Sequence, residues 1–391
     1  MINFIVLGKC KRVTSAVLQA IRSFTDAKCI VIGGPETAVL RWSALCEQQI
    51  TVDLNGTDDD RFVDAVNGIV KTHPHVILIP VDCDGVRLAH RVRDRLMLPV
   101  TPMPDKDALD MFDNKWTFHQ FCMRNGLSVP DTRFISSKSE LDHDAIAAEL
   151  GSPFVVKPLD LAGSTGVQIV HSKAELEQSI LHNDAYNYGA LIAQQYIDGE
   201  DIDVSFLALG GRMAAIAVQQ VHGARIVFCS NPELEAMAED MCRASEYHGV
   251  MHVDARIDAK TGKVYLIESN PRFWASLTAS VWCGLNFVAQ GIIPAPSTSG
   301  IRRLNSGTAY TRFPLLRPGC WQQLVSDAGA RGRLLRAMAL DPVMLGGFLK
   351  DLPAVGWRFV AERAARLVAG MRRASASDAF AKDVAPVDRR A

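Results

Sequence analysis

Short apolar runs alternate with helical patterns over the first hundred residues. The runs Ile2–Gly8 and Lys28–Gly34 are typical of buried parallel strands, and a third follows in "PHVILIP". The helix pattern that begins at "DDDRF" opens with acidic side chains, which suit the positive end of a helix. This alternation predicts a Rossmann-like parallel sheet over residues 1–104. The first turn, "GKCKR", lacks GxGxxG, so we expect no nicotinamide-type dinucleotide site there.

From residue 105 onward, strands outnumber helices. Two strands flank "GG" at Gly210–Gly211 and two more flank "KTGK", as in antiparallel hairpins. We therefore expect an α+β domain over residues 105–300, with a small lobe at about 115–192 and a large lobe at about 193–300. Residues 301–391 have helical stretches and predict a mainly helical C-terminal extension. Its last part, from about residue 374, is typical of a disordered tail.

Composition excludes several classes of protein. The 391 residues carry a net charge of −1, which gives no reason to expect nucleic acid as a partner. No apolar run of about 18 residues is present, so no membrane span is predicted. The nine cysteines are scattered singly without a CxxC pair. This pattern favours a reduced, cytoplasmic protein without a disulfide framework or a zinc cluster.

The stretch "LIESNPR" ends an apolar strand with a carboxylate, a carboxamide and a guanidinium. Glu268 and Asn270 are two residues apart and share a strand face, and Asp254 lies on the partner strand of the expected hairpin. Carboxylate and amide oxygens suit Mg²⁺. Arg272 presents a planar fork that suits a phosphoryl group. The alternative is a purely structural ion pair between Glu268 and Arg272.

Five features follow one another along the chain: Lys115, Lys157 in a strand, a glycine turn, "QQYIDGED", and the carboxylate cluster. Each alone has an ordinary structural explanation, but the ordered set is more specific. It resembles the ATP-grasp superfamily, in particular the carbamoyl-phosphate-synthase-type branch and the related carboxylate–amine ligases. The resemblance covers about residues 1–290. "YLIESNPRFWAS" is similar to the E-x-N-P-R metal strand of that family, and "DNKWTFHQFCMRNGLSVPDT" to its lysine-bearing helix.

The resemblance implies ATP as a cofactor, bound with two Mg²⁺ ions for which Mn²⁺ can substitute. Lys115 and Lys157 would hold the α- and β-phosphates. Gly163, Ser164 and Gly166 would let backbone N–H groups approach the β- and γ-phosphates. The metal ligands would be Asp254, Glu268 and Asn270.

The stretch at the start of the large lobe is expected to hold the nucleoside. Residues that would contact the adenine are Gln194, Gln195, Tyr196 and Ile197. The ribose ligand would be Asp201 by spacing, with Glu200 as its rival. Gln194 and Asp201 depart from the glutamates that many relatives have.

The function that the resemblance implies is ADP-forming ligation. A carboxylate would be phosphorylated to an acyl phosphate and attacked by an amine, with Lys157 and Arg272 as the catalytic residues. Both substrates would be small molecules, and a homodimer is possible on family grounds. In the first domain, Asp82 and Asp84 are candidates to hold an ammonium group. The alternatives are a bicarbonate-activating enzyme like carbamoyl-phosphate synthase, a non-catalytic ATP-binding regulator, and a scaffold attached through the residues after 300.

Overall fold

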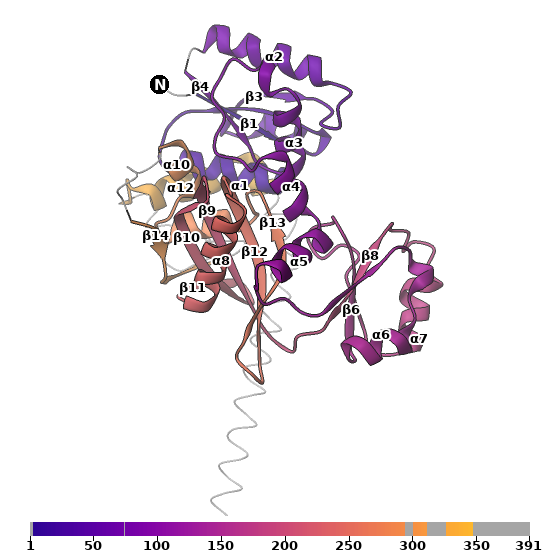
Figure 1. Cartoon of the computed structure of the whole chain (residues 1–391). Helices are drawn as coiled ribbons and strands as arrows, with labels where there is room; N and C mark the ends of the chain where they lie inside the picture. Colours follow the sequence, from indigo (N-terminus) through magenta and orange to yellow (C-terminus); the bar gives the residue numbers. More distant parts are fainter. Residues whose placement is uncertain (1–2, 74, 294–299, 311–325, 347–391) are drawn as a thin grey trace, which may run out of the picture. The chain divides into compact units, whose positions relative to one another are not determined.

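The computed structural model describes residues 3–73, 75–293, 300–310 and 326–346 (Figure 1). Of these described residues, those up to Asp341 belong to one compact unit, and those from Pro342 onward belong to a second. The predicted boundaries near residues 104 and 300 fall inside the first unit and remain predictions. The predicted tail, from about residue 374, lies outside the described residues.

The N-terminal segment forms the predicted parallel sheet, with strand order β3-β2-β1-β4. Its strands are β1 (Asn3–Gly8), β2 (Cys29–Gly33), β3 (Cys46–Thr51) and β4 (Val76–Pro80). Its helices are α1 (Lys11–Arg22), η1 (Pro35–Trp42), α2 (Asp59–Thr72), α3 (Cys83–Arg91) and η2 (Arg93–Arg95). The Rossmann-like prediction is therefore confirmed. The sequence did not predict β3, "CEQQIT", because only two of its residues are apolar.

Asp82, at the end of β4, has a structural role in this sheet. It is 5% exposed, and its carboxylate accepts backbone N–H groups from Lys9 at 2.7 Å, Cys10 at 2.8 Å and Gly85 at 2.9 Å. Burial raises its pKa, against these hydrogen bonds. The neighbouring Asp84 forms an ion pair with the Lys9 ammonium at 3.7 Å. The Asp82 carboxylate thus joins the loop after β1 to the start of α3, and its contact with a substrate ammonium group stays a prediction.

The small lobe is a four-stranded antiparallel sheet in the order β5-β8-β6-β7. Its strands are β5 (Thr132–Ile135), β6 (Phe154–Pro158), β7 (Gln168–Val170) and β8 (Leu191–Gln195). Its helical segments are η3 (Lys138–Glu140), α6 (His143–Leu150), α7 (Lys173–Leu176) and η4 (Glu177–Leu181). Residues 190–221 were expected to hold two strands. They hold three, and the first, β8, belongs to this sheet because it pairs with β5 and β6.

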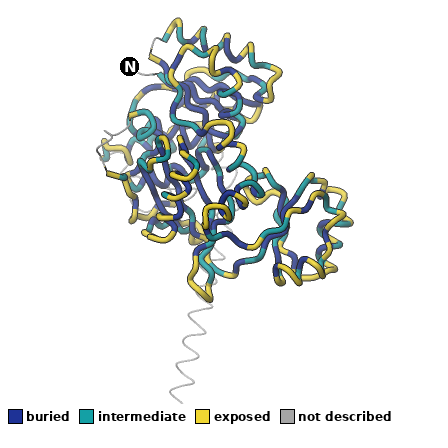
Figure 2. The backbone as a smooth tube through the Cα atoms, viewed as in Figure 1, coloured by how far each residue is buried: buried dark blue, intermediate teal, exposed yellow. Residues whose placement is uncertain are grey.

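The large lobe is built on a seven-stranded sheet in the order β13-β12-β9-β10-β11-β15, with β14 paired to β10. Its strands are β9 (Gly199–Leu209), β10 (Arg212–His222), β11 (Arg225–Cys229), β12 (Gly249–Asp258), β13 (Val264–Asn270), β14 (Arg302–Leu304) and β15 (Gly307–Tyr310). Helices α4 (Lys106–Asp113), α5 (Lys115–Arg124) and α8 (Pro232–Ala244) share one apolar core with these strands. The buried strands of each sheet are dark blue in Figure 2. One face of the large sheet thus packs against this apolar core.

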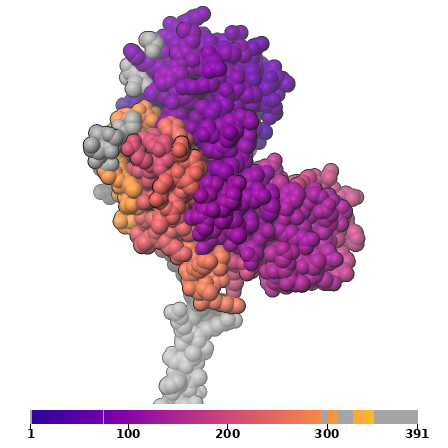
Figure 3. Space-filling model, in the orientation of Figure 1, coloured from indigo at the N-terminus to yellow at the C-terminus, as the bar shows by residue number. Residues whose placement is uncertain are grey.

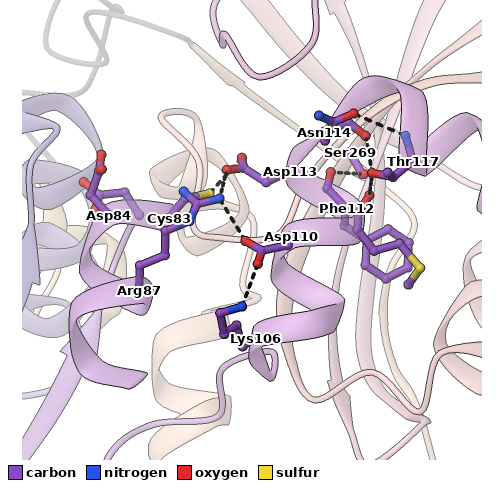
Figure 4. Close-up of polar contacts among 12 residues, drawn as sticks. Cys83, Asp84, Arg87, Lys106, Asp110, Phe112, Asp113, Asn114, Thr117 and Ser269 are labelled. Carbon is purple, nitrogen blue, oxygen red and sulfur yellow. Dashed lines mark hydrogen bonds and ion pairs between the residues drawn. The ribbon is translucent and has the colours of Figure 1, made fainter. Parts of the chain in front are cut away.

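The corner between α4 and α5 is fastened to β13. Ser269 donates its hydroxyl to the carbonyl of Phe112 at 2.7 Å, and the Asn114 side chain caps α5 (Figure 4). Arg87 of α3 donates to the Asp113 carboxylate at 2.6 Å. In Figure 3 the purple surface of this corner adjoins the orange surface of the large sheet. These contacts fix the start of α5, where Lys115 lies.

The chain returns to the first sheet near its described end. Helices α9 (Leu277–Trp282), α10 (Phe287–Ile292) and α12 (Ala330–Ala339) pack against α1. Asn286 donates to the carbonyl of Ala20 at 2.8 Å, and Arg333 to that of Ser23 at 2.8 Å. Of the helices in the described residues, none has the length and apolarity to cross a membrane.

Candidate active site

A β-bulge turns the carboxylate of Glu268 away from the core. Asp254 of β12 pairs with Glu268 of β13, but the next pair is Ala255 with Leu266, so β13 has one extra residue between them. Leu266 is fully buried in the core of the large lobe. Strict alternation would give Glu268 the same direction as Leu266, and the bulge instead places it beside Asp254. The two residues are direct cross-strand partners.

The guanidinium of Arg272 contacts the amide of Asn270 rather than Glu268. Arg272 Nη2 donates to Asn270 Oδ1 at 2.8 Å, and Asn270 Nδ2 donates to Asp254 Oδ2 at 3.0 Å. The Glu268 carboxylate instead forms an ion pair with the Lys115 ammonium at 3.2 Å. The alternative of a Glu268–Arg272 ion pair is therefore wrong for the described residues. To ligate a metal through its oxygen, Asn270 must turn its amide by half a rotation.

Two lysines approach the carboxylates from different elements. Lys115, at the start of α5, is 8% exposed and donates to the carbonyl of Leu161 at 2.7 Å as well as pairing with Glu268. Lys157, on β6, is 4% exposed. Burial lowers the pKa of Lys157 to about 8, although the charge of Glu268 opposes this shift. Burying an ammonium group costs free energy, so its presence here suggests a ligand that its charge binds.

The glycine turn has the backbone geometry of an anion-binding loop. Gly163, Ser164 and Gly166 have φ angles of 70°, 62° and 72°, in the left-handed region. Successive residues of this kind can direct N–H groups toward an anion. Residues 162–165 are exposed, while the carbonyl of Gly166 accepts the hydroxyl of Tyr186 at 2.8 Å. The loop is therefore open at its tip and anchored at its end.

Gly166→Ala is expected to disturb this loop more than Gly163→Ala. Both changes strain a left-handed backbone, at about 1–2 kcal/mol. At Gly166 a Cβ would also lie 2.7 Å from atoms of Pro158 and Tyr188, whereas at Gly163 it meets nothing within 4 Å. We expect a lower melting temperature for Gly166→Ala than for Gly163→Ala, measured by calorimetry. Equal melting temperatures would contradict the anchored geometry.

The residues expected at the adenine lie where β8 leaves the small lobe. Gln194 is 3% exposed and its amide donates to Thr132 Oγ1 at 3.0 Å, so this group already has a partner within the small-lobe sheet. Gln195 is half-buried and Ile197 is buried. The ring of Tyr196 lies 5.6 Å below the guanidinium of Arg256. The adenine contacts of all four residues remain predictions.

The strand alternation of β9 separates the two candidates for the ribose. Asp201 pairs with Arg256 in the register and its carboxylate lies 3.3 Å from that guanidinium, on the face that carries Asp254. Glu200 pairs with Ile257, which packs against the apolar core on the other face. This arrangement favours Asp201 over Glu200.

Two further polar residues lie on this face and were missed by sequence reasoning. Asp203 of β9 lies opposite Asp254, and His252 lies two residues before Asp254 on β12. Burial raises the pKa of Asp203 to about 6. Burial lowers the pKa of His252, but its contact with Asp254 outweighs this effect and the net shift is upward. In the sequence, the only local sign of this cluster was the two-residue spacing of His252 and Asp254. Asp203 is brought beside them by the pairing of β9 with β12, which joins residues some 50 positions apart.

Lys157 of the small antiparallel sheet and Lys115 of α5 thus lie near the carboxylates of the larger antiparallel sheet. Residues 112–276 match the family model of the ATP-grasp domain. Over this segment, which is less than half of the chain, the protein is similar to the ATP-grasp superfamily.

Curated relatives match part of the chain. D-alanine–D-alanine ligase of Xanthomonas axonopodis pv. citri (strain 306) is 31% identical over 165 residues, which are 37% of this chain and 51% of that ligase. The arginine-specific large chain of carbamoyl phosphate synthase from Bacillus subtilis (strain 168) is 26% identical over 44% of this chain and 18% of its own length.

A solved structure shares the fold over most of the chain. It is the biotin carboxylase domain of the 2-oxoglutarate carboxylase of Hydrogenobacter thermophilus, in complex with MgADP, ADP and bicarbonate. Its TM-score is 0.59 at 14% identity, covering 76% of this chain and 71% of that one.

Proposed function

We propose that this protein is an ADP-forming ligase that activates a small carboxylate as an acyl phosphate and couples it to an amine. The observation that carries the proposal is that four separate elements, α5, β6, β12 and β13, bring Lys115, Lys157, Asp254 and Glu268 to one site. A cation pair facing a carboxylate pair suits a polyphosphate bound with metal ions. The similarity to a D-alanine–D-alanine ligase supports the carboxylate–amine chemistry.

The site residues have separate roles in this proposal. Lys115 and Lys157 neutralise phosphate oxygens, and the backbone of the turn at 163–166 covers them. Asp254 and Glu268 fit Mg²⁺ because they are carboxylates paired on neighbouring strands, and Asn270 adds an amide oxygen once its side chain turns. Bound Mg²⁺ supplies charge neutralisation during phosphoryl transfer. Arg272, which is half-buried, presents its fork to the transferred group.

The proposal is tested by trapping the acyl phosphate. Purified protein is incubated with Mg·ATP, pools of carboxylates including amino acids, and hydroxylamine. A ligase releases ADP and forms a hydroxamate that depends on one carboxylate. A non-catalytic ATP-binding regulator would bind ATP and release no ADP, which would refute the proposal.

Bicarbonate activation is the second candidate, because of the similarity to a carbamoyl phosphate synthase and to a biotin carboxylase domain. It predicts ADP release that requires bicarbonate and no other carboxylate. Running the same assay in bicarbonate-depleted buffer, with and without added bicarbonate, separates the two reactions.

Arg256→Met is expected to weaken ATP binding several-fold. Arg256 donates to the carbonyl of Gly199 at 2.6 Å and lies against both Asp201 and Tyr196, so it orients the proposed ribose carboxylate. The variant should lose much less affinity for dideoxy-ATP, which lacks the ribose hydroxyls, than for ATP. Calorimetric titration with both nucleotides measures the difference.

The matched control is Arg243→Met, which removes an arginine from an exposed ion pair with Asp240. It should bind both nucleotides as the wild type does. If Arg256→Met loses affinity equally for ATP and for dideoxy-ATP, Arg256 does not act at the ribose.

A further inference from the structure

A second set of metal-type ligands lies beside the proposed Mg²⁺ residues. Asp203, His252 and Asp254 each direct one ligand atom into a common space, and these atoms lie within 4.8 Å of one another. An imidazole nitrogen with two carboxylates suits first-row transition metals, whereas Mg²⁺ takes oxygen ligands. We infer that these three residues form a site for a divalent transition metal of the Mn²⁺, Co²⁺ or Zn²⁺ class. This site shares Asp254 with the Mg²⁺ site of the proposed function.

The imidazole of His252 is held in one orientation. It is 8% exposed, its Nδ1 lies 2.8 Å from the hydroxyl of Ser205, and its ring stacks on Trp274 at 5.5 Å with an interplanar angle of 16°. A hydrogen-bonded second nitrogen is the usual way in which a metal-binding histidine is oriented. Nε2 is thereby turned toward the carboxylates.

The spacing of the ligand atoms suits an ion between them. His252 Nε2 lies 3.4 Å from Asp254 Oδ1. A hydrogen bond between charged groups is shorter, at about 2.7–2.9 Å. Two ligands of one tetrahedral ion, with bonds of about 2.0–2.1 Å, lie about 3.3–3.4 Å apart. The separation of this one pair matches the second case, and the three ligand atoms together lie within 4.8 Å of one another.

The carboxylates are oriented as well. Asp203 Oδ2 accepts from the Gln219 amide at 3.2 Å. Asp254 has Oδ1 toward His252 and Oδ2 toward Asn270, so one oxygen faces each metal site. Asp254 can therefore bridge the transition-metal site and the proposed nucleotide-metal site.

The test uses the full chain without nucleotide. Co²⁺ is titrated into the protein, followed by its visible absorption and by calorimetry. We expect one Co²⁺ per chain, with the affinity lowered at least about tenfold by His252→Gln and by Asp203→Asn. His222→Gln, at an exposed hairpin position, should keep it. Retained affinity in His252→Gln would overturn the inference.

A measurement on the wild type keeps the inference testable even if a variant fails to fold. With Mn²⁺ bound, pulsed electron paramagnetic resonance should show nitrogen coupling from one imidazole. A spectrum without this coupling, or displacement of Co²⁺ by an equal concentration of Mg²⁺, overturns the assignment. Neither result depends on ATP turnover, so failure here is distinguishable from failure of the proposed ligase, which the hydroxamate assay decides.

Discussion

Glu268→Gln is expected to lower ATP turnover by on the order of 10²-fold or more, because loss of a metal that neutralises developing charge costs several kcal/mol of transition-state energy. Gln keeps the size of the side chain and removes one negative charge. The variant should also require more Mg²⁺ for half-maximal activity. ADP release measured over a Mg²⁺ titration gives both quantities.

The same variant should be less stable without nucleotide. Glu268 is 20% exposed and pairs with the nearly buried Lys115, which would lose its counter-charge. We expect the free energy of unfolding to fall by about 1–3 kcal/mol, less than the 3–5 kcal/mol for a fully broken buried pair, because Gln still accepts a hydrogen bond. Stability alone therefore does not separate a metal ligand from a structural partner, and the Mg²⁺ dependence does.

Glu149→Gln is the matched control. It makes the same change at an exposed ion pair with Arg133 in the small lobe, and both quantities should stay at wild-type values. If Glu268→Gln is destabilised as expected but keeps wild-type turnover and Mg²⁺ dependence, Glu268 serves only as the partner of Lys115.

Local patterns predicted the sheets and the hairpin that carries the site. The apolar runs predicted β1, β2 and β4, and "KTGK" predicted the β12–β13 hairpin, so Asp254 was expected on the partner strand of Glu268. These features depend on residues close in sequence, where periodicity and turn chemistry suffice.

Features that depend on distant residues could not be predicted in this way. The bulge between Leu266 and Glu268 has no glycine to mark it. The ion pair of Lys115 with Glu268 joins residues that are more than 150 positions apart. The contact of Asp203 with His252 requires the β9–β12 register. Tertiary packing sets all three, and a single sequence does not encode them in any local signal.

Lys157→Met is expected to weaken ATP binding by about tenfold or more, because a hydrogen bond to a charged group contributes about 1.5–3 kcal/mol. Turnover should fall as well, since the ammonium is proposed to hold the transferred phosphate. Met keeps the length of the side chain in β6, whose neighbours are apolar. Calorimetry with Mg·ATP and the ADP-release assay measure the two effects, and the exposed Lys173→Met is the control.

The same variant should be more stable than the wild type without nucleotide, and the gain should depend on pH. Lys157 has a pKa of about 8 in the folded protein and 10.5 in the unfolded chain, a difference of about 3 kcal/mol. Below pH 8 both states are protonated, and the wild type bears the full cost of burying the ammonium. Between pH 8 and 10.5 the unfolded state binds more protons, so wild-type stability rises with pH. The advantage of Lys157→Met should therefore be largest below pH 8 and shrink toward pH 10.5, as measured by denaturant unfolding at several pH values. A variant that is less stable at every pH and binds ATP normally would show that Lys157 supports the fold instead of the nucleotide.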